Sequence, residues 1–236
     1  MKIFLAFLLL IIANSASGQK LEVFGGVNRS TFRDGKNDNP HYRSSFEPGY
    51  GFTAGLALDS IIIDRMRHRF SLQVEQYRGK LDVTDGGLAG SYTTTADVRK
   101  TVLSLGFYPL NFMLFKRMDL SLGFVVSVLL HEKFTGRSSG YVMSWPPWNL
   151  PLQEKYDHYS SSMNVGLQGR IAYDIKVSRS IWISPQYHFH YGLLKEFIEF
   201  PDNVGSIRQY FCVGLKKKIG NRRWAIEKGQ LAMNNE

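Results

Sequence analysis

Apolar and polar residues alternate along most of this chain, and the alternation predicts β-strands. Between positions 118 and 133 the apolar residues Leu122, Phe124 and Val126 are interleaved with Ser121 and Gly123. Because successive side chains of a strand point to opposite faces, a period of two residues is typical of a sheet with two unlike faces. Clusters of Gly, Asn, Asp and Pro separate such segments. We predict eight strands, at about 20–31, 49–61, 68–81, 96–109, 118–133, 159–175, 180–195 and 206–220.

The apolar face of these strands is predicted to contact lipid. A tilted strand needs about 9–11 residues to cross a bilayer, and most of the predicted segments are longer than that. The opposite face carries Gly, Ser, Gln and Asn rather than the Lys and Glu of a solvated surface. Small and amide side chains suit a crowded, hydrogen-bonded lumen, which is the polar side of a membrane barrel.

The connections between the predicted strands alternate in length. The short connections lie near 62–67, 110–117 and 176–179. The long connections lie near 32–48, 82–95, 134–158 and 196–205. Short periplasmic turns and long external loops are typical of outer-membrane barrels. The predicted fold class is therefore all-β, an eight-stranded antiparallel up-and-down transmembrane β-barrel with both termini on the short-turn side.

Aromatic residues near the ends of the apolar face fit the same orientation. Outer-membrane barrels carry aromatic girdles at both lipid–water interfaces. Ordinary β-propensity also enriches aromatic residues in strands, so the girdles add weight only beside the loop pattern. We expect Tyr50, Tyr159 and Tyr191 near the outer interface, and Phe70, Phe107 and Tyr173 near the inner one.

The two ends of the chain differ in composition from its middle. Residues 1–18 combine Lys2, an apolar run and small residues, which predicts a cleaved signal peptide and export to the outer membrane. Residues 19–220 are predicted to form the barrel, and residues 221–236 a basic C-terminal tail. The chain has 29 Lys and Arg against 20 Asp and Glu, but export argues against nucleic acid as a partner. The single cysteine, Cys212, has no partner for an internal disulfide.

Several short motifs resemble a known family. The sequences VFGGVN at 23–28 and GYGFTAGL at 49–56 resemble the start of PorT-like outer-membrane β-barrel domains of the Bacteroidota type. The sequences SPQY at 184–187 and YGL at 191–193 are similar to the penultimate strand of that family. The resemblance covers nearly the whole chain after residue 18. It implies an eight-stranded outer-membrane barrel, and some members of the family are associated with protein secretion.

Titratable residues lie on the polar face of the predicted strands, which is expected to line the lumen. They are Glu22, Glu75, Lys100, Asp119, His131, Arg170, Asp174, His188, His190, Arg208 and Lys216. An ion path or a catalytic cluster is one interpretation. A structural network is favoured, because side chains fill the interior of an eight-stranded barrel and buried charges need partners. We predict that Glu75 pairs with Arg170 across the lumen and that His188 joins them.

His158 and Ser160 are the best candidates for nucleophilic catalysis, because residues two apart share a strand face. Some outer-membrane lipid hydrolases present such a pair toward lipid. Counting back from Asn164 puts both residues on the lumen phase or in a loop, which is the wrong side for a lipid substrate. No Cys and His cluster has metal-ligand spacing and no nucleotide-binding motif occurs. We therefore expect no catalytic residue, metal or cofactor.

The long connection at 134–158 contains the sequence WPPW at 145–148. Paired prolines stiffen the backbone, so Trp145 and Trp148 are predicted to form an aromatic ledge. Such a ledge is a candidate contact for a partner protein or for lipid headgroups. The alternative is a loop that packs on itself and caps the barrel.

Three functions are compatible with these patterns. The first is a non-enzymatic outer-membrane barrel, structural or accessory in protein secretion or envelope assembly, whose partners are outer-membrane lipids and a secretion or envelope protein. The second is an outer-membrane lipid-modifying hydrolase. The third is a soluble periplasmic barrel that binds an apolar ligand. The first is favoured, because the lumen is expected to be filled and the hydrolase motif faces away from lipid.

Overall fold

Strands make up nearly all of the chain that the structure describes. No helix in the described ranges is long and apolar enough to cross a membrane. The computed structural model describes residues 19–33, 41–63, 66–115, 117–152, 160–198 and 204–219. Its strands are β1 (Lys20–Arg33), β2 (Tyr42–Ile63), β3 (Met66–Gly87), β4 (Gly90–Leu114), β5 (Met118–Val142), β6 (Trp145–Pro151), β7 (Met163–Tyr173), β8 (Ile175–Lys176), β9 (Ile181–Gly192) and β10 (Gly205–Lys218).

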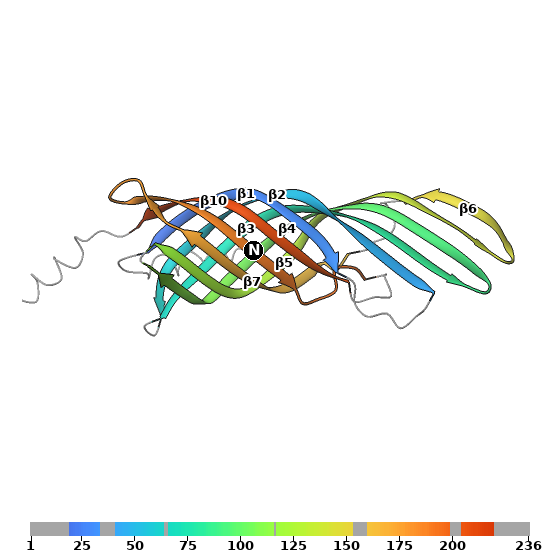
Figure 1. The fold of residues 1–236 in the computed structure, drawn as a ribbon, viewed down its shortest axis with the longest axis horizontal. Coiled ribbons are helices and arrows are strands. Elements are labelled where there is room, and N and C mark those ends of the chain that lie inside the picture. The colour runs from blue at the N-terminus through green and yellow to red at the C-terminus, as the bar shows by residue number, and fades with distance from the viewer. Residues whose placement is uncertain are drawn as a thin grey trace, which may run out of the picture.

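Eight of these strands close into a barrel (Figure 1). Neighbours are antiparallel in the order β10-β1-β2-β3-β4-β5-β7-β9, and β9 pairs again with β10. β1 lies between β10 and β2, since Val27 is opposite both Phe211 of β10 and Phe52 of β2. The short strands β6 and β8 are additions that pair with β5 and β9. The predicted eight-stranded antiparallel barrel is confirmed.

The barrel is apolar outside and polar inside. In β5 the side chains of Ser121 and Ser127 are 1% and 2% exposed, whereas Leu122 and Phe124 are 50% and 52% exposed. A sheet in water hides its apolar face in a core, so this pattern is the reverse of a soluble barrel. Lipid covers such a face in an outer-membrane barrel.

Two of the predicted long loops are wrong, because strands run through most of their described residues. β3 runs to Gly87 and β4 starts at Gly90, so only Leu88 and Ala89 form the turn where a loop at 82–95 was expected. β5 likewise continues to Val142 and returns as β6. The Gly, Ser and Asp residues in these segments favour a loop by composition, but the Thr and Tyr residues among them have high β-propensity. Cross-strand pairing along the whole hairpin favours the strands.

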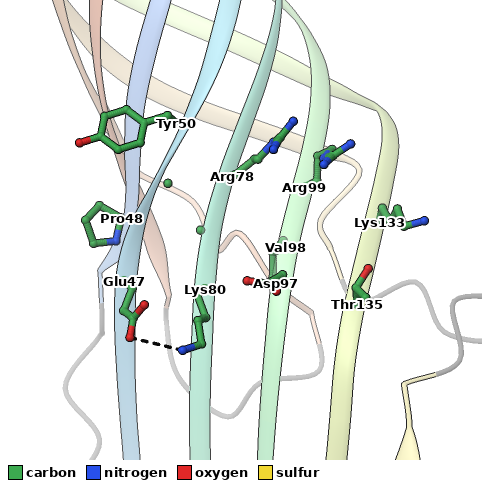
Figure 2. A pocket seen from close by; sticks show the side chains of 12 residues that line it. Glu47, Pro48, Tyr50, Arg78, Lys80, Asp97, Val98, Arg99, Lys133 and Thr135 are labelled. Carbon is green, nitrogen blue, oxygen red and sulfur yellow. Dashed lines mark hydrogen bonds and ion pairs between the residues drawn. The ribbon is translucent and has the colours of Figure 1, made fainter.

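The outer parts of β2 to β5, together with β6, form a sheet that projects beyond the barrel (Figure 1). One face of this projecting sheet carries an apolar core, in which Leu81, Val83 and Val98 are each 1% exposed. Phe197, from the connection between β9 and β10, packs into the same core. The opposite face carries a charged groove across β2 to β5 (Figure 2).

A β-bulge changes the phase of β5 where the barrel meets the projecting sheet. Thr101 and Val102 are consecutive on β4, but their partners on β5 are His131 and Leu129, so β5 has one extra residue there. The extra residue turns the following side chains to the opposite face. His131 is therefore exposed, and the prediction that it lies in the lumen is wrong.

Several predictions concern residues outside the described ranges. They are the signal peptide at 1–18, the basic tail at 221–236, Tyr159 of the outer girdle and His158 of the catalytic motif. These remain predictions from the sequence.

Candidate functional site

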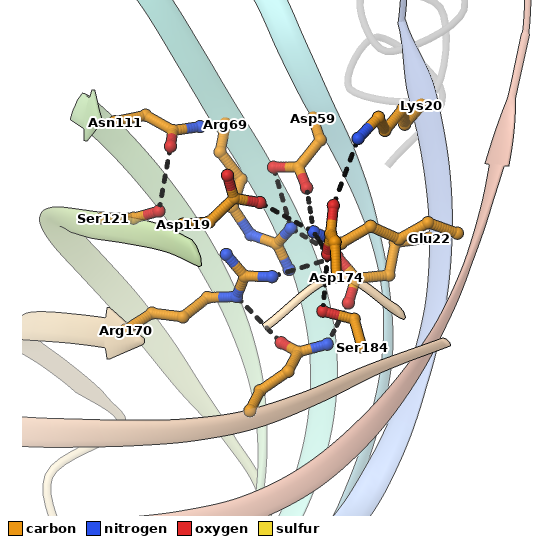
Figure 3. A network of polar contacts seen from close by, with 12 residues as sticks. Lys20, Glu22, Asp59, Arg69, Asn111, Asp119, Ser121, Arg170, Asp174 and Ser184 are labelled. Carbon is orange, nitrogen blue, oxygen red and sulfur yellow. Dashed lines mark hydrogen bonds and ion pairs between the residues drawn. The ribbon is translucent and has the colours of Figure 1, made fainter. Parts of the chain in front are cut away.

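The barrel lumen holds the densest group of buried charges in the described chain. Inward positions of strands near the short turns supply a set that we call the short-turn cluster (Figure 3). Every member is 6% exposed or less. The cluster consists of Glu22, Asp59, Arg69, Asp119, Arg170, Asp174 and Lys216.

Lys216 of β10 joins the carboxylates of the short-turn cluster. Its Nζ atom lies 3.1 Å from Asp59, 2.8 Å from Asp119 and 2.7 Å from Asp174. An ammonium group has three N–H donors, so one lysine can serve three carboxylates. At the rim, Lys20 adds a further ion pair to Asp174 at 3.1 Å. These contacts offset the cost of removing the charges from water.

Two arginines complete the short-turn cluster. Arg69 of β3 lies 2.5 Å from Glu22 and 2.9 Å from Asp59. Arg170 of β7 lies 3.5 Å from Glu22, and its Nε donates to Gln186 at 2.8 Å. Glu22 lies on β1, which is a neighbour of neither β3 nor β7, so the two contacts to Glu22 reach across the lumen. The cluster ties the barrel wall together from the inside.

A second group lies farther from the short turns. Arg208 of β10 donates to Glu75 of β3 and contacts His190 of β9. The Arg208 guanidinium also lies 4.9 Å from the centre of the Tyr77 ring, close enough for a cation–π contact. His188 shares a hydrogen bond of 2.9 Å with Gln168. These side chains fill the middle of the lumen.

Glu75 therefore meets Arg208 and not the predicted partner Arg170. Arg170 lies opposite Ser121 of β5, and Ser121 lies opposite Asn111 of β4. Glu75 lies opposite Val102 of β4, so the two charges are at different levels of the barrel. Counting residues from the nearest turn ignores the stagger between tilted strands, which shifts heights around a barrel. Arg170 is closer to the short turns, where Glu22 is its partner.

The connection between β9 and β10 closes the outer mouth of the barrel. Glu196 accepts hydrogen bonds from Tyr77, Lys100 and Asn164, each at 2.9 Å. The next residue, Phe197, is fully buried, and its ring lies 4.1 Å from the Lys100 Nζ. Glu196 and Phe197 thus form a plug, which we call the mouth plug.

The electrostatics of the mouth plug favour an ionised Glu196, which belongs to the connection and not to a spanning strand. Burial alone raises the pKa of Glu196, but the Lys100 ammonium and the hydrogen bonds from Ser206 and Tyr77 outweigh it. The pKa is lowered below its ordinary value. The plug does not follow from the sequence pattern, which predicts an external loop at 196–205. Phe197, directly after Glu196, is the local signal for burial, since it is fully buried whereas Leu194 and Ile198 are 44% and 62% exposed.

The other candidate residues are dispersed. Ser160 is 3% exposed and forms an isolated bridge with Phe197, so it lies beside the mouth plug. Within the described ranges no group of His, Cys, Asp and Glu is arranged to hold a metal ion. Trp145 is 75% exposed and Trp148 is partly exposed. Both lie on β6, so the predicted aromatic loop is a strand of the projecting sheet.

A family comparison agrees with this architecture. Residues 14–197 match the family described as outer membrane protein beta-barrel domain. Neisserial surface protein A (NspA) is 13% identical, with a TM-score of 0.40 over 86% of this chain and 100% of its own. OprG from Pseudomonas aeruginosa is 12% identical, with a TM-score of 0.37 over 88% of this chain and 99% of its own. No curated protein sequence matches the chain.

The matched region covers most of the barrel and several of its inward-facing charges. The family description agrees with the ring of antiparallel strands, the apolar outer surface and the polar lumen. The chain therefore belongs to the outer membrane protein beta-barrel domain family.

Proposed function

We propose that this protein is a closed, non-enzymatic outer-membrane barrel that acts as a structural or accessory component in envelope assembly or protein secretion. In this proposal residues 1–18 direct export, the barrel anchors the protein among outer-membrane lipids, and the projecting sheet contacts a secretion or envelope protein. The observation that carries the proposal is the combination of a filled lumen with a large external sheet.

The filled lumen argues against transport and catalysis. Arg69, Arg208 and Lys216 are fully buried, and each contacts a carboxylate. The interior of an eight-stranded barrel is just wide enough for side chains, so these residues leave no continuous path. Ser160 is buried beside the mouth plug, so a lipid ester has no access to its hydroxyl.

The projecting sheet supplies a surface suited to protein contact. Its turns expose large apolar side chains, with Leu88 107%, Met143 87% and Trp145 75% exposed. Exposed apolar side chains that gather in one area mark interaction sites in many proteins. These turns lie at the far end of the sheet from the barrel, where lipid does not cover them (Figure 1). The PorT-like resemblance of the sequence favours a partner in secretion.

Trimming the projecting sheet tests the proposal. Val83 pairs with Thr94 and Ser138 with Leu150, so residues 84–93 and 139–149 can each be replaced by an Asn-Gly turn without changing the strand register. We expect the trimmed protein to keep the mobility shift on heating in SDS that closed barrels show. In a strain that lacks the protein, it should fail to restore envelope integrity or secretion, whereas the full chain succeeds.

A matched variant separates this proposal from enzymatic alternatives. Ser160→Ala in the full chain should restore the strain as well as the unmodified protein does. Full rescue by the trimmed barrel would contradict the role of the projecting sheet. Loss of rescue with Ser160→Ala in a correctly folded barrel would favour a hydrolase.

A further inference from the structure

The outward face of β3, β4 and β5 changes character in steps along the strands. The register brings residues of the three strands into rows, each row two residues beyond the last. The first row is apolar, the second is polar, the third is cationic and the fourth is mixed in charge. In that order the rows are Val74–Leu103–Val128, Gln76–Thr101–His131, Arg78–Arg99–Lys133 and Lys80–Asp97–Thr135.

The third row, which we call the cationic row, places like charges directly opposite one another. Arg99 has Arg78 on one side and Lys133 on the other. Like charges at opposed positions of a sheet are unfavourable. In the fourth row, Lys80 lies 3.4 Å from Glu47 and opposite Asp97. The repulsion is between Arg78 and Arg99, which lie opposite each other on β3 and β4.

Backbone features of the strands create this row. The β-bulge at Leu129 and His131 turns Lys133 outward, beside Arg99. Without the extra residue, the inward phase of Ser127 and Leu129 would carry Lys133 into the interior. A groove of about 610 Å³ lies over the row and over the adjoining Lys80, and Figure 2 shows the side chains of Arg78, Arg99 and Lys133 along it. At its edge, a Cβ on Gly49 would lie 2.5 Å from the Arg78 carbonyl oxygen, so only glycine allows β2 to approach there.

The cationic row lies at the level of lipid headgroups. Arg78 is four residues beyond Val74, which is 41% exposed and belongs to the lipid-facing surface. At about 3.3 Å per residue and a tilt of about 35–45°, this separation is about 10 Å along the membrane normal. Tyr50, which is 68% exposed, lines the same groove, and tyrosine favours the lipid–water interface. The projecting sheet and the connection between β9 and β10 are on this side, and the longer extensions of outer-membrane barrels are external.

We propose that the cationic row binds the phosphate group of an anionic lipid in the outer leaflet. Arg78 and Arg99 would each present a planar guanidinium, which recognises phosphate through paired N–H donors. Lys133 adds a third positive charge to the same level. A phosphate bound there compensates the like-charge repulsion, and the acyl chains of the same lipid lie along the apolar rows below. This continuity with the lipid-facing surface favours a lipid over a soluble anion.

The test is lipid binding by purified, folded protein in detergent. The probes are lipid A with both of its phosphates, the same lipid after enzymatic removal of both phosphates, and inorganic pyrophosphate. We expect the full chain to bind the phosphorylated lipid about tenfold more tightly than either other probe, a difference of about 1.4 kcal/mol. The double variant Arg78→Gln/Arg99→Gln should lose this preference. Lys80→Gln, which removes a neutralised charge from the same groove, should keep it.

Each other outcome overturns the proposal. Equal binding of both lipids would show that phosphate is not recognised, and equal binding of pyrophosphate would make the site one for soluble anions. An unchanged preference in the double variant would place the phosphate elsewhere. A separate readout is the urea midpoint of unfolding, which should stay the same or rise in the double variant because repulsion is relieved. A large fall in that midpoint would show that the two arginines are structurally paired.

Discussion

Arg208 of β10 donates a hydrogen bond to Glu75 of β3 across the lumen, and both side chains are buried. The two strands are not neighbours in the ring, so this contact joins separate parts of the wall. Because the pair is buried, removing one partner leaves the other charge without compensation in a poorly solvated interior. Such a substitution lowers the stability of the fold strongly.

Glu75→Gln is therefore expected to lower the free energy of unfolding by about 3–5 kcal/mol, the usual cost of breaking a buried pair. The measurement is urea unfolding of the barrel in lipid vesicles. A double-mutant cycle with Arg208→Gln should show strong coupling. The matched cycle with Arg170→Gln should be additive to within about 0.5 kcal/mol, because Arg170 contacts Glu22 instead. Equal coupling in the two cycles would contradict this assignment.

The lipid-facing surface makes a second prediction. Val126 lies on the outward face of β5 and is 38% exposed. Val126→Arg should lower the free energy of unfolding by about 2–4 kcal/mol, the cost of an arginine near the bilayer midplane. Thr135→Arg, on the outward face of the same strand but beyond the cationic row, is the control and should change stability little. Similar effects of the two substitutions would argue that lipid does not cover Val126.

The mouth plug makes a prediction about pH. The lowered pKa of Glu196 means that its contacts stabilise the fold when the carboxylate is ionised. That contribution is complete above the ordinary value of 4.5 and is lost as the pH falls through the lower value in the folded state. Unfolding measured against pH should show Glu196→Gln to be less stable than the unmodified protein at pH 7. The difference should shrink in acid; a difference that is constant down to pH 3 would contradict the ionised plug.

The sequence predicts the barrel well because its period-two pattern is long and clear. The alternation alone predicts that Ser127 points into the barrel and that Val126 points outward, as the structure has them. The lumen partners do not follow, because strand stagger decides that Glu75 meets Arg208 and that Arg170 meets Glu22. Stagger depends on closure of the whole ring, which no local segment encodes.

Other features were missed for local reasons. The outward position of His131 depends on a bulge, and a single extra residue leaves no mark in an alternating pattern. The hairpin of β3 and β4 is rich in Gly, Thr and Asp, so its composition resembles a loop although its strands pair without interruption. The burial of Glu196 depends on contacts with β3, β4 and β7, which are distant in the sequence.

The central claim is that side chains fill the lumen and that the mouth plug closes it. Planar-bilayer recording of the purified full chain tests this claim most directly. We predict that inserted protein, verified by its mobility shift on heating, gives no steady open-channel current, because charged side chains occupy the interior from the short-turn cluster to Glu196. Large and sustained open-channel currents from the same preparation would contradict the account.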